Sequence, residues 1–266
     1  MHCYDQLSVL VSLVLLGIAL SSIIELPIKS LTLIVLDHPF PLSLSVPRII
    51  AFLLAAMVWT GTDSMVRSHS KVRSAGLGYA VTFCPLPTLF TLVAFFLVLP
   101  LSINRSFWLG GLALIGFLLS LIIVGEWHTI DHNDGIARLG LNTITYLVAL
   151  ALYMGIYKEV RGPLSAVAIM VVSTLLALDL LRVGRNEAGR TWLCALVAGL
   201  IMGEAAWALN YWRISGLRGG MLLLLIFYVI TGLAQQGLSS RLTRWVLVEF
   251  ATVAVVGLIA LYRYAP

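Results

Sequence analysis

Nine runs of apolar residues, separated by short polar gaps, occupy most of this sequence. They cover roughly 7–24, 47–66, 76–99, 106–126, 139–157, 163–181, 190–212, 218–237 and 242–262. A helix needs about 20 apolar residues to cross the hydrocarbon core of a bilayer, which is about 30 Å thick. Each run reaches or approaches that length. We therefore predict an all-α, polytopic transmembrane helical bundle with eight to nine membrane-spanning helices and no soluble domain.

The composition agrees with this fold class. Hydrophobic residues make up 60% of the 266 residues and charged residues 11%, whereas soluble chains have about 45–50% and about 25%. So few charged residues cannot cover a water-soluble surface of this size, and the lipid bilayer is therefore the expected partner of most of the exterior. We expect 1–266 to form one integral membrane domain in the plasma (inner) membrane.

The positions of the basic residues exclude one class of partner and suggest an orientation. The 17 lysines and arginines give a net charge of +5, but they lie in or beside the gaps between apolar runs. This distribution is typical of membrane-flanking residues rather than of a groove that follows phosphates, so no nucleic-acid partner is expected. The two densest basic clusters, 67–73 and 182–190, fall on the same side. We predict that they, and the N-terminus, are cytoplasmic.

Proline interrupts the helical pattern in two places. The segment 25–46 contains Pro27, Pro39 and Pro41, and its apolar piece is too short to span a membrane. We predict an irregular interfacial or re-entrant segment there, whose backbone is satisfied by protein or water. The sequence Cys84-Pro85-Leu86-Pro87 lies inside the third run and predicts a kink, because proline removes backbone hydrogen bonds.

Two acidic residues within the apolar runs have a structural explanation. Asp63 lies one turn before Arg67, and Asp179 lies three residues before Arg182. Residues at these spacings share a helix face, and a long basic side chain near a helix end can reach the interface. We predict that both are local ion pairs.

The run 190–212 also contains small residues spaced four apart, at Ala195, Gly199 and Gly203. Small residues at this spacing allow the backbones of membrane helices to approach each other closely. The spacing predicts close packing against another helix.

Glu204, in the same run, is the strongest candidate for a functional residue. It has no basic residue within two turns on either side, and an ionisable group inside the hydrocarbon costs roughly 2.5–3.5 kcal/mol on the lenient scale. Trp207 and Tyr211 follow at i+3 and i+7, so the three residues predict the wall of a substrate-binding cavity. The alternative is a neutral carboxyl hydrogen-bonded to another helix, for example to Asn142 or Gln235.

A second candidate site is a polar cluster between the fourth and fifth runs. Glu126, His128, Asp131 and His132 fall within this short segment, which ends at Asp134. If a helix continues through it, His128 and His132 are i and i+4 on one face, the spacing at which two imidazoles can share a metal ion. These four residues are weak candidates for catalysis, and the two histidines for metal binding. The alternative is a solvated loop that caps the next helix.

Three functions remain open from the sequence. The first is a transporter, or a protein that handles small molecules or lipids, with a cavity around Glu204. The second is a non-catalytic membrane subunit that packs against other subunits of a larger complex. The third is a membrane-embedded enzyme that acts on a lipid-linked substrate through the cluster from Glu126 to Asp134. No phosphate-binding loop or haem-ligand spacing is present in the sequence, and it identifies no cofactor.

Overall fold

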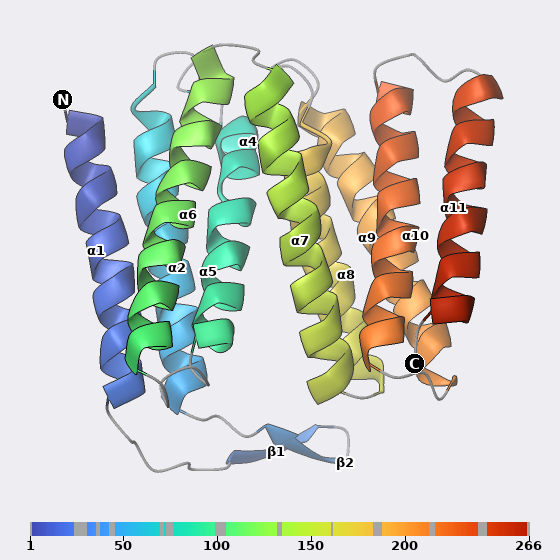
Figure 1. The fold of residues 1–266 in the computed structure, drawn as a ribbon, viewed down its shortest axis with the longest axis horizontal. Helices are drawn as coiled ribbons and strands as arrows, with labels where there is room; N and C mark the ends of the chain where they lie inside the picture. The colour runs from blue at the N-terminus through green and yellow to red at the C-terminus, as the bar shows by residue number, and fades with distance from the viewer. Residues whose placement is uncertain are drawn as a thin grey trace. The chain divides into compact units, whose positions relative to one another are not determined.

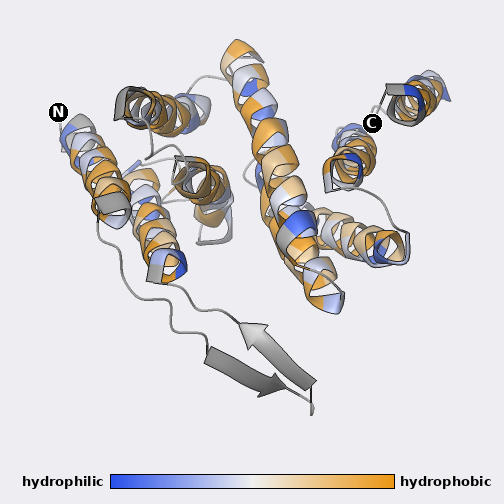
Figure 2. Ribbon diagram, turned by 60° about the horizontal axis from the view of Figure 1, so that its bottom comes forward, coloured by the Kyte–Doolittle hydropathy of each residue, from blue (hydrophilic) through white to orange (hydrophobic). Residues whose placement is uncertain are grey.

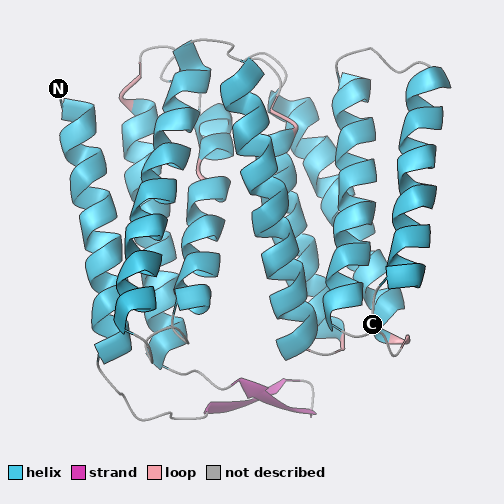
Figure 3. Cartoon of the chain, in the orientation of Figure 1, coloured by secondary structure: helices cyan, strands magenta, loops and turns pink. Residues whose placement is uncertain are grey.

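The computed structural model contains helices at all the predicted apolar runs and one short hairpin (Figures 1 and 3). It describes residues 2–23, 31–35, 38–42, 46–69, 72, 77–98, 105–131, 135–160, 162–182, 188–212, 216–238 and 244–264. Apolar residues cover the helices along most of their length (Figure 2). Within the described ranges, seven helical segments are long and apolar enough to cross a membrane. The fold is therefore a helical membrane bundle, and the predicted count of eight to nine spanning helices is not confirmed.

Contacts group the helices into two compact units. Unit 1 comprises 1–69 and 87–127, and unit 2 comprises 70–86 and 128–266. Each unit is described by itself below. The prediction of one membrane domain over 1–266 stays a prediction.

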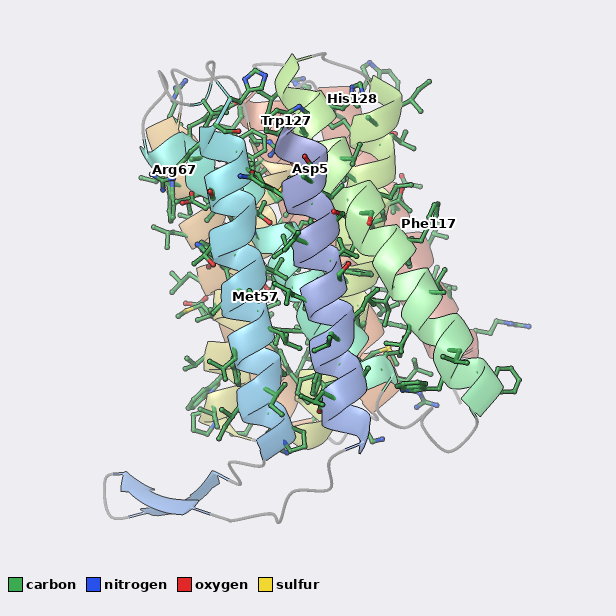
Figure 4. All side chains as sticks on the ribbon, turned by 90° about the vertical axis from the view of Figure 1, so that its left-hand side faces the viewer. Asp5, Met57, Arg67, Phe117, Trp127 and His128 are labelled. Atoms are coloured by element: carbon green, nitrogen blue, oxygen red, sulfur yellow. The ribbon has the colours of Figure 1, made fainter. Side chains whose placement is uncertain are left out.

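Unit 1 is built on α1 (His2–Ile23), α2 (Val46–Arg67), most of α5 (Pro85–Val98) and most of α6 (Arg105–Asp131). Glycines let leucine side chains pack against helix backbones: a Cβ on Gly17 would lie 2.5 Å from Leu54, and one on Gly61 would lie 2.8 Å from Leu10. Phe117 projects outward from α6, and Trp127 and His128 lie near its end (Figure 4). The α1–α2 pair is thus fixed by two glycine–leucine contacts.

The connection between α1 and α2 contains regular structure. Strands β1 (Leu31–Val35) and β2 (His38–Leu42) pair antiparallel, with Leu31 opposite Leu42. They form the middle of the segment predicted as irregular, and the remaining residues of 25–45 lie outside the described part. The interfacial or re-entrant position of this segment stays a prediction.

Unit 2 contains α7 (Gly135–Glu159), α8 (Pro163–Leu180), α9 (Ala188–Asn210), α10 (Gly216–Leu238) and α11 (Arg244–Tyr264). Neighbours along the chain pack against each other, and α10 also packs against α7 (Figure 1). The closest pair is α8 and α9. Ala195 is buried, and a Cβ on Gly199 or Gly203 would meet Thr174 or Met170 of α8 at 3.0 Å or less. The predicted small-residue packing is confirmed.

The third apolar run is a broken helix, as its prolines predicted. It consists of α4 (Leu77–Ala80), the 3-10 turn η1 (Val81–Phe83), a bend at Cys84, and α5 (Pro85–Val98). Pro85 and Pro87 have no backbone N–H, so the α-helical ladder cannot run continuously through them. α4 contacts α9, and η1 contacts α8. The break therefore lies beside the α8–α9 pair of unit 2.

Candidate functional site: a buried ion pair beside a broken helix

Asp179 and Arg182 form an ion pair that is buried at the C-terminal end of α8. Their exposed fractions are 5% and 8%, and the neighbouring Leu178, Leu180 and Leu181 are buried as well. Nη2 of Arg182 lies 3.6 Å from Oδ1 of Asp179. The predicted pair is confirmed. The arginine was predicted to reach the membrane interface, whereas both side chains are enclosed by protein.

Residues from two further elements contact the pair. The hydroxyl oxygen of Thr145 on α7 lies 3.2 Å from Oδ2 of Asp179 and 2.9 Å from the carbonyl oxygen of Leu141. On the other side, the Cζ atom of Arg182 lies 3.8 Å from the ring centroid of Phe83, the last residue of η1. A guanidinium over an aromatic face is a cation–π contact. The arginine therefore bridges the end of α8 and the break in the third run.

In the same region, side chains donate hydrogen bonds to the backbone carbonyl groups at the end of α8, which is a short helix. α8 has 18 residues, whereas α7 has 25 and α9 has 23. Beyond its last turn, the guanidinium of Arg138 donates a hydrogen bond to the carbonyl oxygen of Arg182, and the hydroxyl of Thr191 donates to that of Leu181, 3.4 Å away. Basic groups stabilise the negative end of a helix dipole. Arg138 and Thr191 thus stabilise this helix end.

The pair is not arranged for maximum stability. Its closest charged atoms are farther apart than in a hydrogen bond, and Oδ1 of Asp179 accepts no hydrogen bond from any described residue. Burying two charges costs several kcal/mol per ion unless short hydrogen bonds offset the loss of water. An Asp and an Arg held in this way offer both signs of charge to a polar ligand. They form the candidate site.

This site was not predicted from the sequence, because the spacing of Asp179 and Arg182 by itself indicates only a local ion pair. The shortness of the apolar run 163–181 could have indicated the site, because the charged end of a short helix lies within the length of the longer helices around it. Nothing in the sequence indicated that Thr145 or Phe83 would contact the pair, because each comes from a distant segment.

Glu204, Trp207 and Tyr211 lie together on the exposed side of α9 and its end. Within the described part of the chain, Glu204 makes no hydrogen bond or ion pair, including with Asn142 and Gln235. The predicted cavity around Glu204 stays a prediction, and its opposite wall would have to come from outside the described residues.

Asn210 is a polar residue of α9 that faces the beginning of α8. Its side-chain amide donates to the hydroxyl oxygen of Ser165, 2.9 Å away, and lies 3.2 Å from the carbonyl oxygen of Gly162. Gly162 has a φ of 77°, a left-handed conformation that favours glycine, and it precedes Pro163 at the start of α8. Asn210 therefore joins the end of α9 to the beginning of α8.

The polar cluster after the fourth run is only partly described. α6 continues to Asp131, so His128 is helical, as the metal hypothesis requires. Glu126 is fully buried and His128 is exposed. His132 and Asp134 lie outside the described residues, as does the side chain of Asp131. In the described part of the chain, no three His, Cys, Asp or Glu side chains are grouped to hold a metal ion. The catalytic and metal-binding assignments stay predictions.

The apolar helices define this chain as a multi-pass helical membrane protein. Comparison with known protein families also identifies the family of the chain. The chain belongs to the family described as "Protein of unknown function (DUF5656)", whose model matches residues 26–263. Comparisons with curated proteins and with solved structures found no match.

Proposed function

We propose that the protein is a membrane carrier that binds a small molecule or lipid, whose polar part interacts with Asp179 and Arg182. The observation that carries this proposal is the buried ion pair itself, with a 3.6 Å separation and an Oδ1 that accepts no hydrogen bond from the described residues. Ionisable groups within membrane helices mark substrate or ion pathways by default. A ligand that donates a hydrogen bond to Oδ1 of Asp179 would offset part of the cost of burying this charge.

The broken helix next to the pair supports the same function. Transporters commonly build their substrate sites from discontinuous helices, where unwound backbone and charged groups meet. Here Phe83 of η1 contacts Arg182, so a shift of the break would change the environment of the guanidinium. Through this contact, ligand binding at Arg182 and movement of the broken helix can depend on each other.

Ligand screening by thermal stability tests the proposal. A ligand that binds only the folded protein raises its melting temperature by mass action. The purified protein would be screened against amino acids, nucleosides, carboxylates, organic cations and phospholipids. The test variant is Asp179→Asn, which keeps an oxygen to accept the Thr145 hydroxyl. The control is Asp63→Asn, which removes the same charge from the 2.7 Å pair with Arg67 in unit 1.

The expected result is a class of compound that stabilises the wild type and Asp63→Asn but not Asp179→Asn. Equal stabilisation of all three proteins would contradict the proposed site. A panel with no stabilising compound, combined with a less stable Asp179→Asn protein, would show that the pair only holds the end of α8.

A second candidate function is a subunit of a membrane assembly. The observation that favours it is the exposed position of Glu204 on a helix that is long and apolar enough to span the membrane. The enzyme hypothesis for the cluster from Glu126 to Asp134 stays a prediction.

A further inference from the structure

Six residues along α9 and its end form a stripe at heptad spacing. They follow one another at intervals of four, three, four, three and four residues, and all are exposed: Leu193, Val197, Leu200, Glu204, Trp207 and Tyr211. We call them the α9 outer stripe. The opposite side of the helix, with Ala195, Gly199 and Met202, is buried. The stripe therefore lies on the side of α9 opposite its buried residues.

Glu204 lies close to the centre line of this stripe and inside the membrane span. The span covers Gly189–Asn210, and Glu204 is six residues from its nearer end, a rise of about 9 Å. The carboxyl is too short to reach the headgroups from the centre of an outward face as a lysine or arginine could. Lipid tails offer it no hydrogen bond. This position requires a protein surface that covers the stripe and supplies a polar partner.

The spacing of the stripe indicates what that surface is. Apolar residues every 3.5 positions pack two parallel helices against each other, and a polar residue in the seam fixes the register. Most oligomers are symmetric, and a two-fold axis brings each seam residue against its own copy. A neutral carboxyl has one donor and at least one acceptor, so two Glu204 side chains satisfy each other. Trp207 and Tyr211 are of the types enriched at protein interfaces.

We propose that a second copy of this chain covers the α9 outer stripe, through a two-fold contact in which the two Glu204 carboxyl groups hydrogen-bond to each other. The proposal does not depend on the carrier function assigned to Asp179 and Arg182, because the contacts of that pair come from Thr145 and Phe83 and involve no residue of the stripe. It gives Glu204 a role in assembly.

Cysteine cross-linking in membranes tests the contact. The natural cysteines Cys3, Cys84 and Cys194 are first replaced with alanine. Leu200→Cys then introduces a thiol on the stripe. Ile201→Cys is the matched control, because Ile201 lies at the same depth and is also exposed (40%, against 53% for Leu200). It is the next residue along the helix, so its side chain points around the helix away from the stripe.

Oxidation is expected to link Leu200→Cys chains into a product of twice the 29.0 kDa chain mass, several-fold more than Ile201→Cys chains. Equal yields at the two positions would overturn the proposal. So would a product whose mass shows a different polypeptide, since the partner would then be another protein. This comparison leaves Glu204 intact and does not depend on whether a Glu204 variant folds.

Substitution of the carboxyl provides the second measurement. In the Leu200→Cys protein, Glu204→Leu is expected to reduce the dimer yield several-fold, whereas Glu204→Gln retains most of it because two amides also hydrogen-bond to each other. The control is Glu249→Leu, which removes another exposed acid from α11 and should leave the yield unchanged. A yield that is insensitive to Glu204→Leu would show that the carboxyl pair does not exist.

Discussion

Replacing Gly199 with alanine tests the closest contact of the fold, between α8 and α9. A Cβ at this position would clash with the hydroxyl oxygen of Thr174 and lie 2.8 Å from the carbonyl oxygen of Met170. The Thr174 hydroxyl can rotate away, but it then loses its 2.8 Å hydrogen bond to the Met170 carbonyl. The carbonyl belongs to the backbone, so relief of the second contact requires the two helices to move apart.

The expected cost follows from these contacts. Forcing an extra methyl group into a packed interior costs about 1–3 kcal/mol, and losing the hydroxyl hydrogen bond costs about 1 kcal/mol more. Alanine recovers about 1 kcal/mol of helix propensity relative to glycine. We therefore expect Gly199→Ala to lower the free energy of unfolding by about 1–3 kcal/mol.

Reversible unfolding in mixed micelles, followed by circular dichroism, measures this change. The control is Gly155→Ala in α7, where an added Cβ meets no atom within 4 Å of those described. That variant should match the wild type or gain up to about 1 kcal/mol. If Gly199→Ala is as stable as Gly155→Ala, the helices are not packed as described.

A double variant identifies the contact responsible. Thr174→Ala removes the oxygen that lies closest to the added Cβ, while the Met170 carbonyl remains. The loss in Gly199→Ala/Thr174→Ala should therefore be smaller than the sum of the two single losses, by about 0.5–3 kcal/mol. Additive losses would show that Thr174 does not oppose the added methyl group.

Three further predictions concern other parts of the chain. Tyr153→Phe removes a 2.7 Å hydrogen bond to Ser173, and both residues are fully buried. The free energy of unfolding should fall by about 1–3 kcal/mol because the serine hydroxyl loses a buried partner, and unchanged stability in chemical unfolding would contradict this. His128 is exposed, so His128→Ala should cost less than about 0.5 kcal/mol; if His128 is instead a metal ligand, elemental analysis of the wild type will find stoichiometric metal that the variant lacks. Gly189→Cys, in a protein without other cysteines, should escape an impermeant thiol reagent in intact cells, and efficient labelling would invert the predicted orientation.

The positions of the helices could be predicted from the sequence because an apolar run of sufficient length has few alternatives in a membrane. Every backbone polar group must be satisfied within the segment, so such a run forms a helix. The predicted and observed ends of most helices agree within two residues, for example 163–181 against Pro163–Leu180. The larger differences occur at α1, which begins five residues before the predicted run, and at α6 and α7, which extend by four or five residues into the polar cluster. Polar turns can continue a helix at the interface, where water satisfies their side chains.

Local features within one helix could be predicted for the same reason. The break at Pro85 depends only on the missing backbone N–H, and the pairing of Asp63 with Arg67 depends only on their spacing along α2. The approach of α9 to another helix followed from Gly199 and Gly203, since the absence of a side chain is itself the signal.

The direction in which each helix faces was decided by tertiary structure alone. In a soluble protein, the apolar side of a helix marks its buried face, but in a membrane both the lipid-facing and the protein-facing sides are apolar. The sequence therefore could not show that Glu204 points outward from α9 while Asn210 points toward α8. Nor could it show that Asp179 and Arg182 are enclosed by Thr145 and Phe83, because these contacts join segments far apart in the chain and leave no periodic pattern in any one of them.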